Sequence, residues 1–171
     1  MKFTPTQKED LPRIMEIVKE AQHYLADLNI DQWQDNYPNE ETILNDIEKK
    51  QSFVIKDNGL IIGTTVFTTE EDLNYRKVEG GSWLTPMDNV YGVIHRIAVS
   101  NEYRSKGFAK FVFNNCEQLL KEQGIESMRI DTHRDNLGMQ SLVKTLGYKY
   151  CGIIYLARGG AERFAFEKTL N

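Results

Sequence analysis

Hydrophobic side chains recur at the spacing of an α-helix in the first part of the chain. The apolar positions, three or four residues apart, are Leu11, Ile14, Val18, Ala21, Leu25 and Leu28. Asp10 comes just before this stripe as a candidate N-cap, and Pro12 suits the first turn, where a missing N–H is tolerated. The pattern predicts a first helix over this segment.

Three more helices are predicted by the same spacing. Asn39 is the candidate cap of a second helix, which carries Ile43, Leu44 and Ile47. A third is predicted over residues 108–123 and ends at Gly124, because glycine is common at helix C-termini. A fourth is predicted over residues 138–146.

Strands are predicted where short runs of apolar and β-branched residues lie between turn residues. These runs are residues 52–56, 60–69, 90–99, 127–131, 148–155 and 163–168. Asp57-Asn58-Gly59 indicates a hairpin, since Asn and Gly tolerate positive φ. Residues 70–89 are polar, with Gly80-Gly81 and Pro86, and are expected to form a long, mobile loop. Helices between the middle strands and hairpins at both ends predict a mixed α+β fold, a sheet covered by helices.

Composition narrows the class of protein. A chain of 171 residues with 40% hydrophobic and 27% charged residues is expected to form a single domain over residues 1–171. The 21 basic residues against 25 acidic ones, a net charge of −4, argue against a nucleic-acid partner. No apolar run approaches the roughly 20 residues that span a bilayer, and the N-terminus lacks a signal-peptide pattern. Two distant cysteines, Cys116 and Cys151, fit a cytoplasmic protein with reduced thiols and no membrane partner.

The segment that carries chemistry follows the strand ending at Val99. A polar turn leads into Arg104-x-x-Gly107-x-Ala109, which opens the third helix. The first N–H groups of a helix have no intrahelical partner and carry partial positive charge, so a phosphate fits there. The motif is neither a P-loop nor a dinucleotide fingerprint, and an ordinary turn with solvated basic residues is the alternative.

This segment is similar to the acetyl-CoA motif R/Q-x-x-G-x-G/A of the GNAT family of N-acetyltransferases. The similarity runs from Ile97-Ala98-Val99 through Tyr103-Arg104-Ser105-Lys106-Gly107-Phe108-Ala109. It continues in a strand at residues 128–131, in Asn136 and in Leu146-Gly147-Tyr148, in the order and spacing that the family has. The similarity is specific from about residue 90 to residue 155.

The resemblance implies a GNAT fold: a mostly antiparallel mixed sheet of about six to seven strands, with strands 4 and 5 splayed apart. It implies acetyl-CoA as cosubstrate and no metal. The pantetheine arm would bond the backbone of Ile97, Ala98 and Val99, with Asn136 on its other side. The pyrophosphate would lie on the backbone N–H groups of Arg104, Ser105, Lys106, Gly107, Phe108 and Ala109.

His95 is the candidate catalytic base, since histidine titrates near neutral pH and lies on the strand that leads to this motif. Strand alternation places it on the face of Ile97 and Val99, bulges aside, with Arg96 turned away as a structural or ion-pairing residue. A structural histidine is the alternative. A zinc site of His95, His133 and Cys151 has no recognised ligand spacing.

The proton donor for the leaving thiolate is open. Many members of the family use a tyrosine at the position that Val143 occupies here, and valine cannot donate a proton. Tyr148 is a candidate acid, with Tyr150 and Tyr155 nearby, although such aromatics also serve as core residues. A thiolate also leaves tolerably without full protonation, because its pKa is near 8.5.

Trp33 and Tyr37 are candidate acceptor-binding residues in the connection between the first two helices. They could pack on an apolar substrate stem while Asp31 or Asp35 attracts its ammonium group, or they could simply anchor the connection. Trp83 is ambiguous in the same way.

The resulting hypothesis is an enzyme that transfers acetyl from acetyl-CoA to a primary amine by direct attack. The alternatives are an acyl-CoA-binding sensor without turnover and a module for another phosphate-containing ligand. The sequence leaves open the acceptor, a small-molecule or peptide amine, as well as the preferred acyl chain and the oligomeric state, for which a homodimer is one option.

Overall fold

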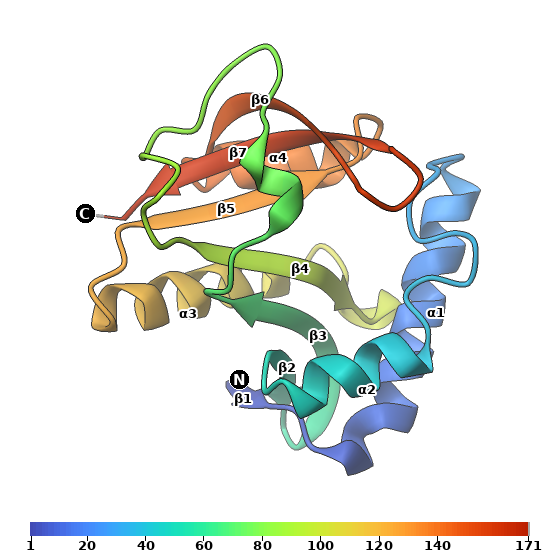
Figure 1. Ribbon diagram of the computed structural model, residues 1–171. Coiled ribbons are helices and arrows are strands. Elements are labelled where there is room, and N and C mark those ends of the chain that lie inside the picture. Colours follow the sequence, from blue (N-terminus) through green and yellow to red (C-terminus); the bar gives the residue numbers. More distant parts are fainter. Residues whose placement is uncertain (171) are drawn as a thin grey trace. The chain divides into compact units, whose positions relative to one another are not determined.

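The computed structural model describes residues 1–170, which contain seven strands and four α-helices (Figure 1). The strands are β1 (Lys2–Pro5), β2 (Ser52–Asp57), β3 (Leu60–Thr68), β4 (Gly92–Val99), β5 (Ser127–Thr132), β6 (Lys149–Tyr155) and β7 (Glu162–Thr169). The helices are α1 (Leu11–Asp27), α2 (Glu40–Glu48), α3 (Phe108–Glu122) and α4 (Leu137–Thr145), with short 3-10 turns η1 (Lys8–Asp10), η2 (Leu73–Arg76) and η3 (Asn101–Tyr103).

The strands are hydrogen-bonded in the order β1-β2-β3-β4-β5-β7-β6. Antiparallel pairing joins β1 to β2, β2 to β3, β5 to β7 and β7 to β6. β4 and β5 pair in parallel, through Gly92 with Met128 and Val93 with Arg129. The predicted fold class, a mixed and mostly antiparallel α+β sheet of six to seven strands, is confirmed.

β1 is an element that the sequence pattern did not reveal. It is only four residues long, with an exposed lysine at one end and a proline at the other. Proline is tolerated there because β1 pairs with β2 alone, as an edge strand. Its one aromatic residue, Phe3, stacks on Phe53 of β2 with ring centroids 4.9 Å apart.

The local signals for turns and caps are confirmed with one exception. Asn58 and Gly59 both have positive φ, 48° and 84°, in the tight β2–β3 hairpin, and the Asn39 side chain accepts the Thr42 N–H at 3.0 Å. Asp10 does not cap α1 with its side chain, because it already has helical φ and ψ where η1 runs into the helix. Its carboxylate instead accepts the Gln7 N–H at 2.9 Å.

The chain divides into two compact units that interleave in sequence. Unit 1 contains residues 1–67 and 95–115, and unit 2 contains residues 68–94 and those from Cys116 onward. The boundaries fall inside β4 and inside α3. The core of unit 1 packs Ile14 and Val18 of α1 and Ile43 of α2 against Val54 of β2. Whether the chain behaves as a single domain stays a prediction.

In unit 2 the segment between β3 and β4 corrects the expectation of a mobile loop. It contains η2 and a β-bridge from Glu79 to Ile153. Its aromatic residues Tyr75 and Trp83 are buried in a core cluster with Tyr91. The prediction of a mobile loop followed from the mostly polar composition of the segment. It did not take account of these few aromatic residues, which pack the segment into the core.

A buried ion pair fixes the same segment. Arg129 and Glu167 are fully buried and lie 3.1 Å apart. The Arg129 guanidinium lies between the rings of Trp83 and Tyr91, 4.4 and 3.9 Å from their centroids. The Glu167 carboxylate accepts N–H bonds from Leu84 and Thr85. Burial disfavours the charged form of Glu167. The hydrogen bonds from Ser127 and Thr85, together with the nearby Arg129, have the larger effect and lower the Glu167 pKa.

Candidate active site

The second half of β4, in unit 1, departs from a regular strand at Arg96. This residue has φ of 50°, in the left-handed region that non-glycine residues rarely adopt. Strict alternation therefore does not hold across it: His95, Arg96 and Ile97 are all half-buried. Ala98 returns to the core, where it packs with Ile17 and Ala21 of α1.

β3 is shaped to receive this irregular backbone. A Cβ on Gly63 would lie 3.0 Å from the Ala98 carbonyl oxygen and 2.7 Å from the side chain of Ile55, so only glycine fits without a shift. The buried Thr65 hydroxyl donates to the His95 carbonyl oxygen at 3.1 Å. A side chain of β3 thus satisfies a backbone acceptor directly before Arg96.

The Arg96 side chain is held by α2 and by the connection that precedes it. Its Nε and one terminal nitrogen donate to both carboxylate oxygens of Asp46, at 3.1 and 2.6 Å. The other terminal nitrogen donates to the Tyr37 hydroxyl at 2.7 Å. Burial disfavours the charge of Arg96, but Tyr37 and Asp46 outweigh it and hold the Arg96 pKa above its ordinary value. The expectation that Arg96 forms an ion pair is confirmed.

Asp46 is a residue of this cluster that the sequence analysis missed. It is 3% exposed, on α2. Burial raises the Asp46 pKa, while Arg96 and, through its charge, His95 oppose that shift. An acidic residue three positions after Ile43, on the apolar stripe of a predicted helix, was the available signal. The structure thus brings His95, Arg96, Asp46 and Tyr37 together.

The turn before α3 has the backbone that the phosphate hypothesis requires. Ser105 and Gly107 have positive φ, 63° and 83°. The first intrahelical bond runs from the Phe111 N–H to the Gly107 carbonyl at 3.1 Å, so the N–H groups of Phe108 and Ala109 precede the bonded part of the helix. A Cβ on Gly107 would meet no atom within 4 Å, so the space beside this backbone is open.

Two cations flank the turn, and aromatic rings orient both. The Arg104 guanidinium lies 3.6 Å from the ring centroid of Tyr24, on α1, and donates to the Asn101 side chain at 2.7 Å. The Lys106 ammonium lies 5.3 Å from the ring of Tyr103. Neither cation pairs with a carboxylate of residues 1–170. Their charge therefore remains available to an anion.

One side of α1 holds this turn in place. The Glu20 carboxylate accepts the Asn101 N–H at 2.6 Å and the Ser100 hydroxyl at 3.1 Å. Arg13 donates to the Ser100 hydroxyl at 3.3 Å and to the Ile61 carbonyl at 3.2 Å. Arg13, Glu20 and Tyr24 are seven and four residues apart, a helical spacing that the hydrophobic pattern did not reveal because these residues are polar.

The two candidate acceptor-binding residues make structural contacts. Trp33, with φ of 61°, packs on the cluster of Ile17, Ala21 and Ala98. Tyr37 bonds Arg96 as described. Both therefore anchor the connection between α1 and α2, and their role toward an acceptor stays a prediction.

The remaining candidates lie in unit 2. Asn136 caps α4, its side chain accepting the Met139 N–H at 3.1 Å. Tyr148 is 3% exposed and donates to the Glu117 carboxylate at 2.9 Å, and burial, with Glu117 second, raises its pKa far above the ordinary value. Val143 is fully buried in α4. In residues 1–170 no group of three or more His, Cys, Asp or Glu side chains is placed to hold a metal ion.

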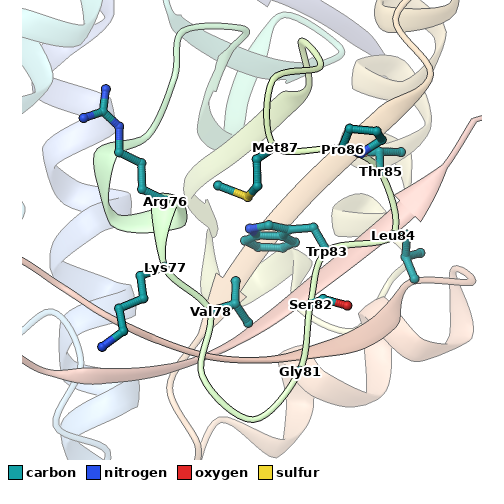
Figure 2. A pocket seen from close by; sticks show the side chains of 10 residues that line it. All are labelled: Arg76, Lys77, Val78, Gly81, Ser82, Trp83, Leu84, Thr85, Pro86 and Met87. Carbon is teal, nitrogen blue, oxygen red and sulfur yellow. The ribbon is translucent and has the colours of Figure 1, made fainter.

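Unit 2 also contains a cavity of about 550 Å³ within the segment before β4 (Figure 2). Both polar and apolar side chains line it, with the Trp83 indole between Met87 and Val78. The Arg76 and Lys77 side chains at its edge pair with Glu71 and Glu79, at 2.7 and 2.6 Å.

Comparison with known proteins decides the family. The sequence matches the acetyltransferase (GNAT) family over residues 14–148. The chain belongs to this family. No curated protein matches the chain. The match to the family confirms the resemblance stated from residues 97–109 and the general activity of an acetyltransferase.

Solved structures of GNAT proteins share the fold. An acetyltransferase of the GNAT family from Streptococcus agalactiae is 29% identical, with a TM-score of 0.89 over 99% of this chain and 95% of that one. A GNAT acetyltransferase from Listeria monocytogenes is 17% identical, with a TM-score of 0.76 over 99% and 94%. The PaiA N-acetyltransferase of Thermoplasma acidophilum, solved in complex with coenzyme A, is 20% identical, with a TM-score of 0.69 over 98% of each chain.

In the part of the GNAT chain that the structure describes, no helix is both long and apolar enough to cross a membrane.

Proposed function

We propose that this GNAT protein transfers the acetyl group of acetyl-CoA to a primary amine by direct attack, without an acyl-enzyme. The observation that carries the proposal is the turn before α3. It combines two left-handed residues, unbonded helix N–H groups and open space at Gly107. The coenzyme A complex of the Thermoplasma acidophilum protein, which shares the fold, supports this choice of cosubstrate.

The residues of the turn fit a pyrophosphate. Successive N–H groups around left-handed residues form an anion-binding concavity, and the helix N-terminus adds partial positive charge. We assign this role to the backbone from Arg104 to Ala109, with the Arg104 and Lys106 side chains at its edge. The backbone of Ile97, Ala98 and Val99 is assigned to the pantetheine arm, as the family resemblance implies. Acetyl-CoA, when bound there, supplies the acetyl group as a thioester.

His95 is assigned the role of base. An alkylammonium group has a pKa of about 10.4, so an amine must lose a proton before it attacks. His95 is half-buried in β4, two residues before Ile97, and its carbonyl is fixed by Thr65. The imidazole would accept the proton of the ammonium group and release it to solvent after the transfer.

The proton for the departing thiolate is assigned to water. The Tyr148 hydroxyl donates a hydrogen bond to Glu117, and its raised pKa makes it a poor acid. Val143 offers no proton. Since a thiol has a pKa of about 8.5, the thiolate leaves without a dedicated side-chain acid.

A panel of primary amines tests the proposal, with release of free thiol from acetyl-CoA as the readout. We expect at least one amine to support turnover. We expect His95→Ala to lower kcat at pH 7 by about 100-fold, with partial recovery at high pH, where the amine is already neutral. His23→Ala, an exposed histidine of α1, is the matched control and should behave as wild type.

Identical pH–rate profiles for wild type and His95→Ala would remove His95 from the role of base. Tight CoA binding without turnover of any amine would instead favour the sensor. Equal affinity for CoA and ADP would point to another phosphate-containing ligand.

A further inference from the structure

We propose that Arg96 is a positioning residue for the active site, and that Asp46 and Tyr37 act through it to hold the second half of β4 in its catalytic conformation. This inference rests on the proposed function, because it concerns the geometry of His95 and Ile97. It goes further in assigning a role to the ion pair of Arg96 and Asp46, which the proposed function does not use.

The backbone of Arg96 is the first observation. An arginine with φ of 50° inside a strand is strained, since its Cβ crowds the backbone in the left-handed region. Such a conformation persists only where the surroundings enforce it. Its neighbours on either side are His95, the candidate base, and Ile97, whose backbone is assigned to pantetheine.

The contacts of the Arg96 side chain hold its backbone in this conformation. Both Asp46 oxygens and the Tyr37 hydroxyl accept hydrogen bonds from three nitrogens of one guanidinium, at 2.6 to 3.1 Å. Arginine offers this planar fork, whereas lysine does not. Because Asp46 is almost fully buried, loss of Arg96 would leave its carboxylate poorly compensated. The left-handed backbone and the ion pair therefore stabilise each other.

The same guanidinium anchors the connection between α1 and α2. Asn29, Trp33, Asp35 and Asn36 in this connection also have positive φ. Gln22 donates to the Tyr37 and Pro38 carbonyls, at 3.1 Å each, and the Tyr37 hydroxyl then reaches Arg96. Arg96 thus ties β4 to a connection in which candidate acceptor-binding residues lie.

The position of Arg96 predicts which kinetic constant it controls. Glu20 and Arg13 of α1 bind Asn101 and Ser100, which lead from β4 into the phosphate turn. Disturbing Arg96 should therefore misalign His95 and the neighbouring backbone of Ile97, while the phosphate turn still supplies most of the affinity for CoA. We expect kcat to fall while the Kd for CoA changes little.

The variants are Asp46→Asn, Tyr37→Phe, Arg96→Lys and Arg96→Gly. Glycine relieves the backbone strain but removes the guanidinium, so it separates the two contributions. We expect Arg96→Gly and Asp46→Asn each to lower kcat by at least about tenfold, with the Kd for CoA, from calorimetry, within about threefold of wild type. The matched control Glu41→Gln, an exposed residue of α2, should leave both constants unchanged.

The double variant Arg96→Gly/Asp46→Asn should be no slower than Arg96→Gly, because Asp46 acts through Arg96. Wild-type kcat in Arg96→Gly, or losses that multiply in the double variant, would overturn the proposal. A loss of CoA binding in step with a lower Tm would also overturn it, since that pattern indicates a purely structural role.

Amide hydrogen exchange at residues 95–97 measures the positioning without any turnover. We expect faster exchange there in Asp46→Asn and Arg96→Gly than in wild type, and unchanged exchange in Glu41→Gln. Unchanged exchange in all variants would overturn the positioning role. A wild type that acetylates no amine contradicts the proposed function instead, so the two failures are distinguishable.

Discussion

The two cysteine thiols are held in their neutral form by burial. Burial, with Glu167 second, raises the Cys151 pKa to about 11, and burial raises that of Cys116 further. Neither sulfur is exposed in the described structure. A neutral, buried thiol is a poor nucleophile, which agrees with direct transfer to the amine rather than a cysteine acyl-enzyme.

The native protein should therefore resist iodoacetamide. At pH 8 a thiol with a pKa of about 11 is only about 0.1% thiolate, so alkylation of Cys151 should be at least a hundredfold slower than in the unfolded chain. Mass spectrometry of the native protein and of the urea-unfolded protein measures this difference. Rapid alkylation of Cys151 in the native state would contradict the buried, neutral thiol.

Gly107 and Arg96 show what the sequence can predict at the scale of a residue. Gly107 belongs to a local motif, and its positive φ follows from the turn itself. Arg96 also has positive φ, but the partners of its side chain, Asp46 and Tyr37, lie 50 and 59 residues away along the chain. The sequence predicted that Arg96 forms ion pairs, yet it could not predict the partner or the strained backbone.

At the scale of elements, α1 has two faces with different tasks. Its apolar stripe forms the core with α2, as the hydrophobic spacing predicted. Its polar stripe of Arg13, Glu20 and Tyr24 holds the turn before α3. Polar residues on a predicted helix usually face solvent, so only the folded arrangement reveals this second task.

Glu20→Ala should therefore raise the KM for acetyl-CoA by about tenfold and leave kcat nearly unchanged. The Glu20 carboxylate accepts two hydrogen bonds, from the Ser100 hydroxyl and the Asn101 N–H. A hydrogen bond to a charged group contributes about 1.5 kcal/mol. Glu16→Ala is the control, because Glu16 pairs with the same Arg13 without a bond to the turn. A tenfold change in kcat at constant KM would contradict the assignment of Glu20 to the phosphate turn.

The element boundaries were predictable to within one or two residues wherever periodicity and turn residues agreed, as in the β2–β3 hairpin. The segment before β4 was not, because Tyr75 and Trp83 pack on residues from β6 and β7 that are distant in sequence. No pattern in the sequence indicated β1, because β2, the strand with which it pairs, lies about 50 residues later in the chain.

At the scale of the whole molecule, the two compact units share elements of the chain. β4 and α3 each contribute residues to both units. Neither unit is therefore a continuous piece of sequence that could fold alone. This connectivity predicts one cooperative unfolding transition, as a single domain of this size normally shows.

Coincident transitions would support that prediction. Far-UV circular dichroism follows the backbone of both units, whereas fluorescence follows Trp33 of unit 1 and Trp83 of unit 2. Fluorescence of Trp33→Phe and Trp83→Phe, each with one remaining indole, should give the same midpoint as circular dichroism of that variant. Two separate midpoints would show that the units unfold independently and contradict a single domain.

The central claim is that the turn before α3 holds the phosphates of acetyl-CoA. Calorimetric titration of CoA into wild type, Gly107→Val and Gly124→Val tests it most directly. Both glycines have positive φ, 83° and 70°, and at both a Cβ would meet open space, so the two substitutions strain the backbone alike at opposite ends of α3. We predict that wild type and Gly124→Val bind CoA equally, while Gly107→Val shows no measurable binding. Wild-type affinity in folded Gly107→Val would contradict the account.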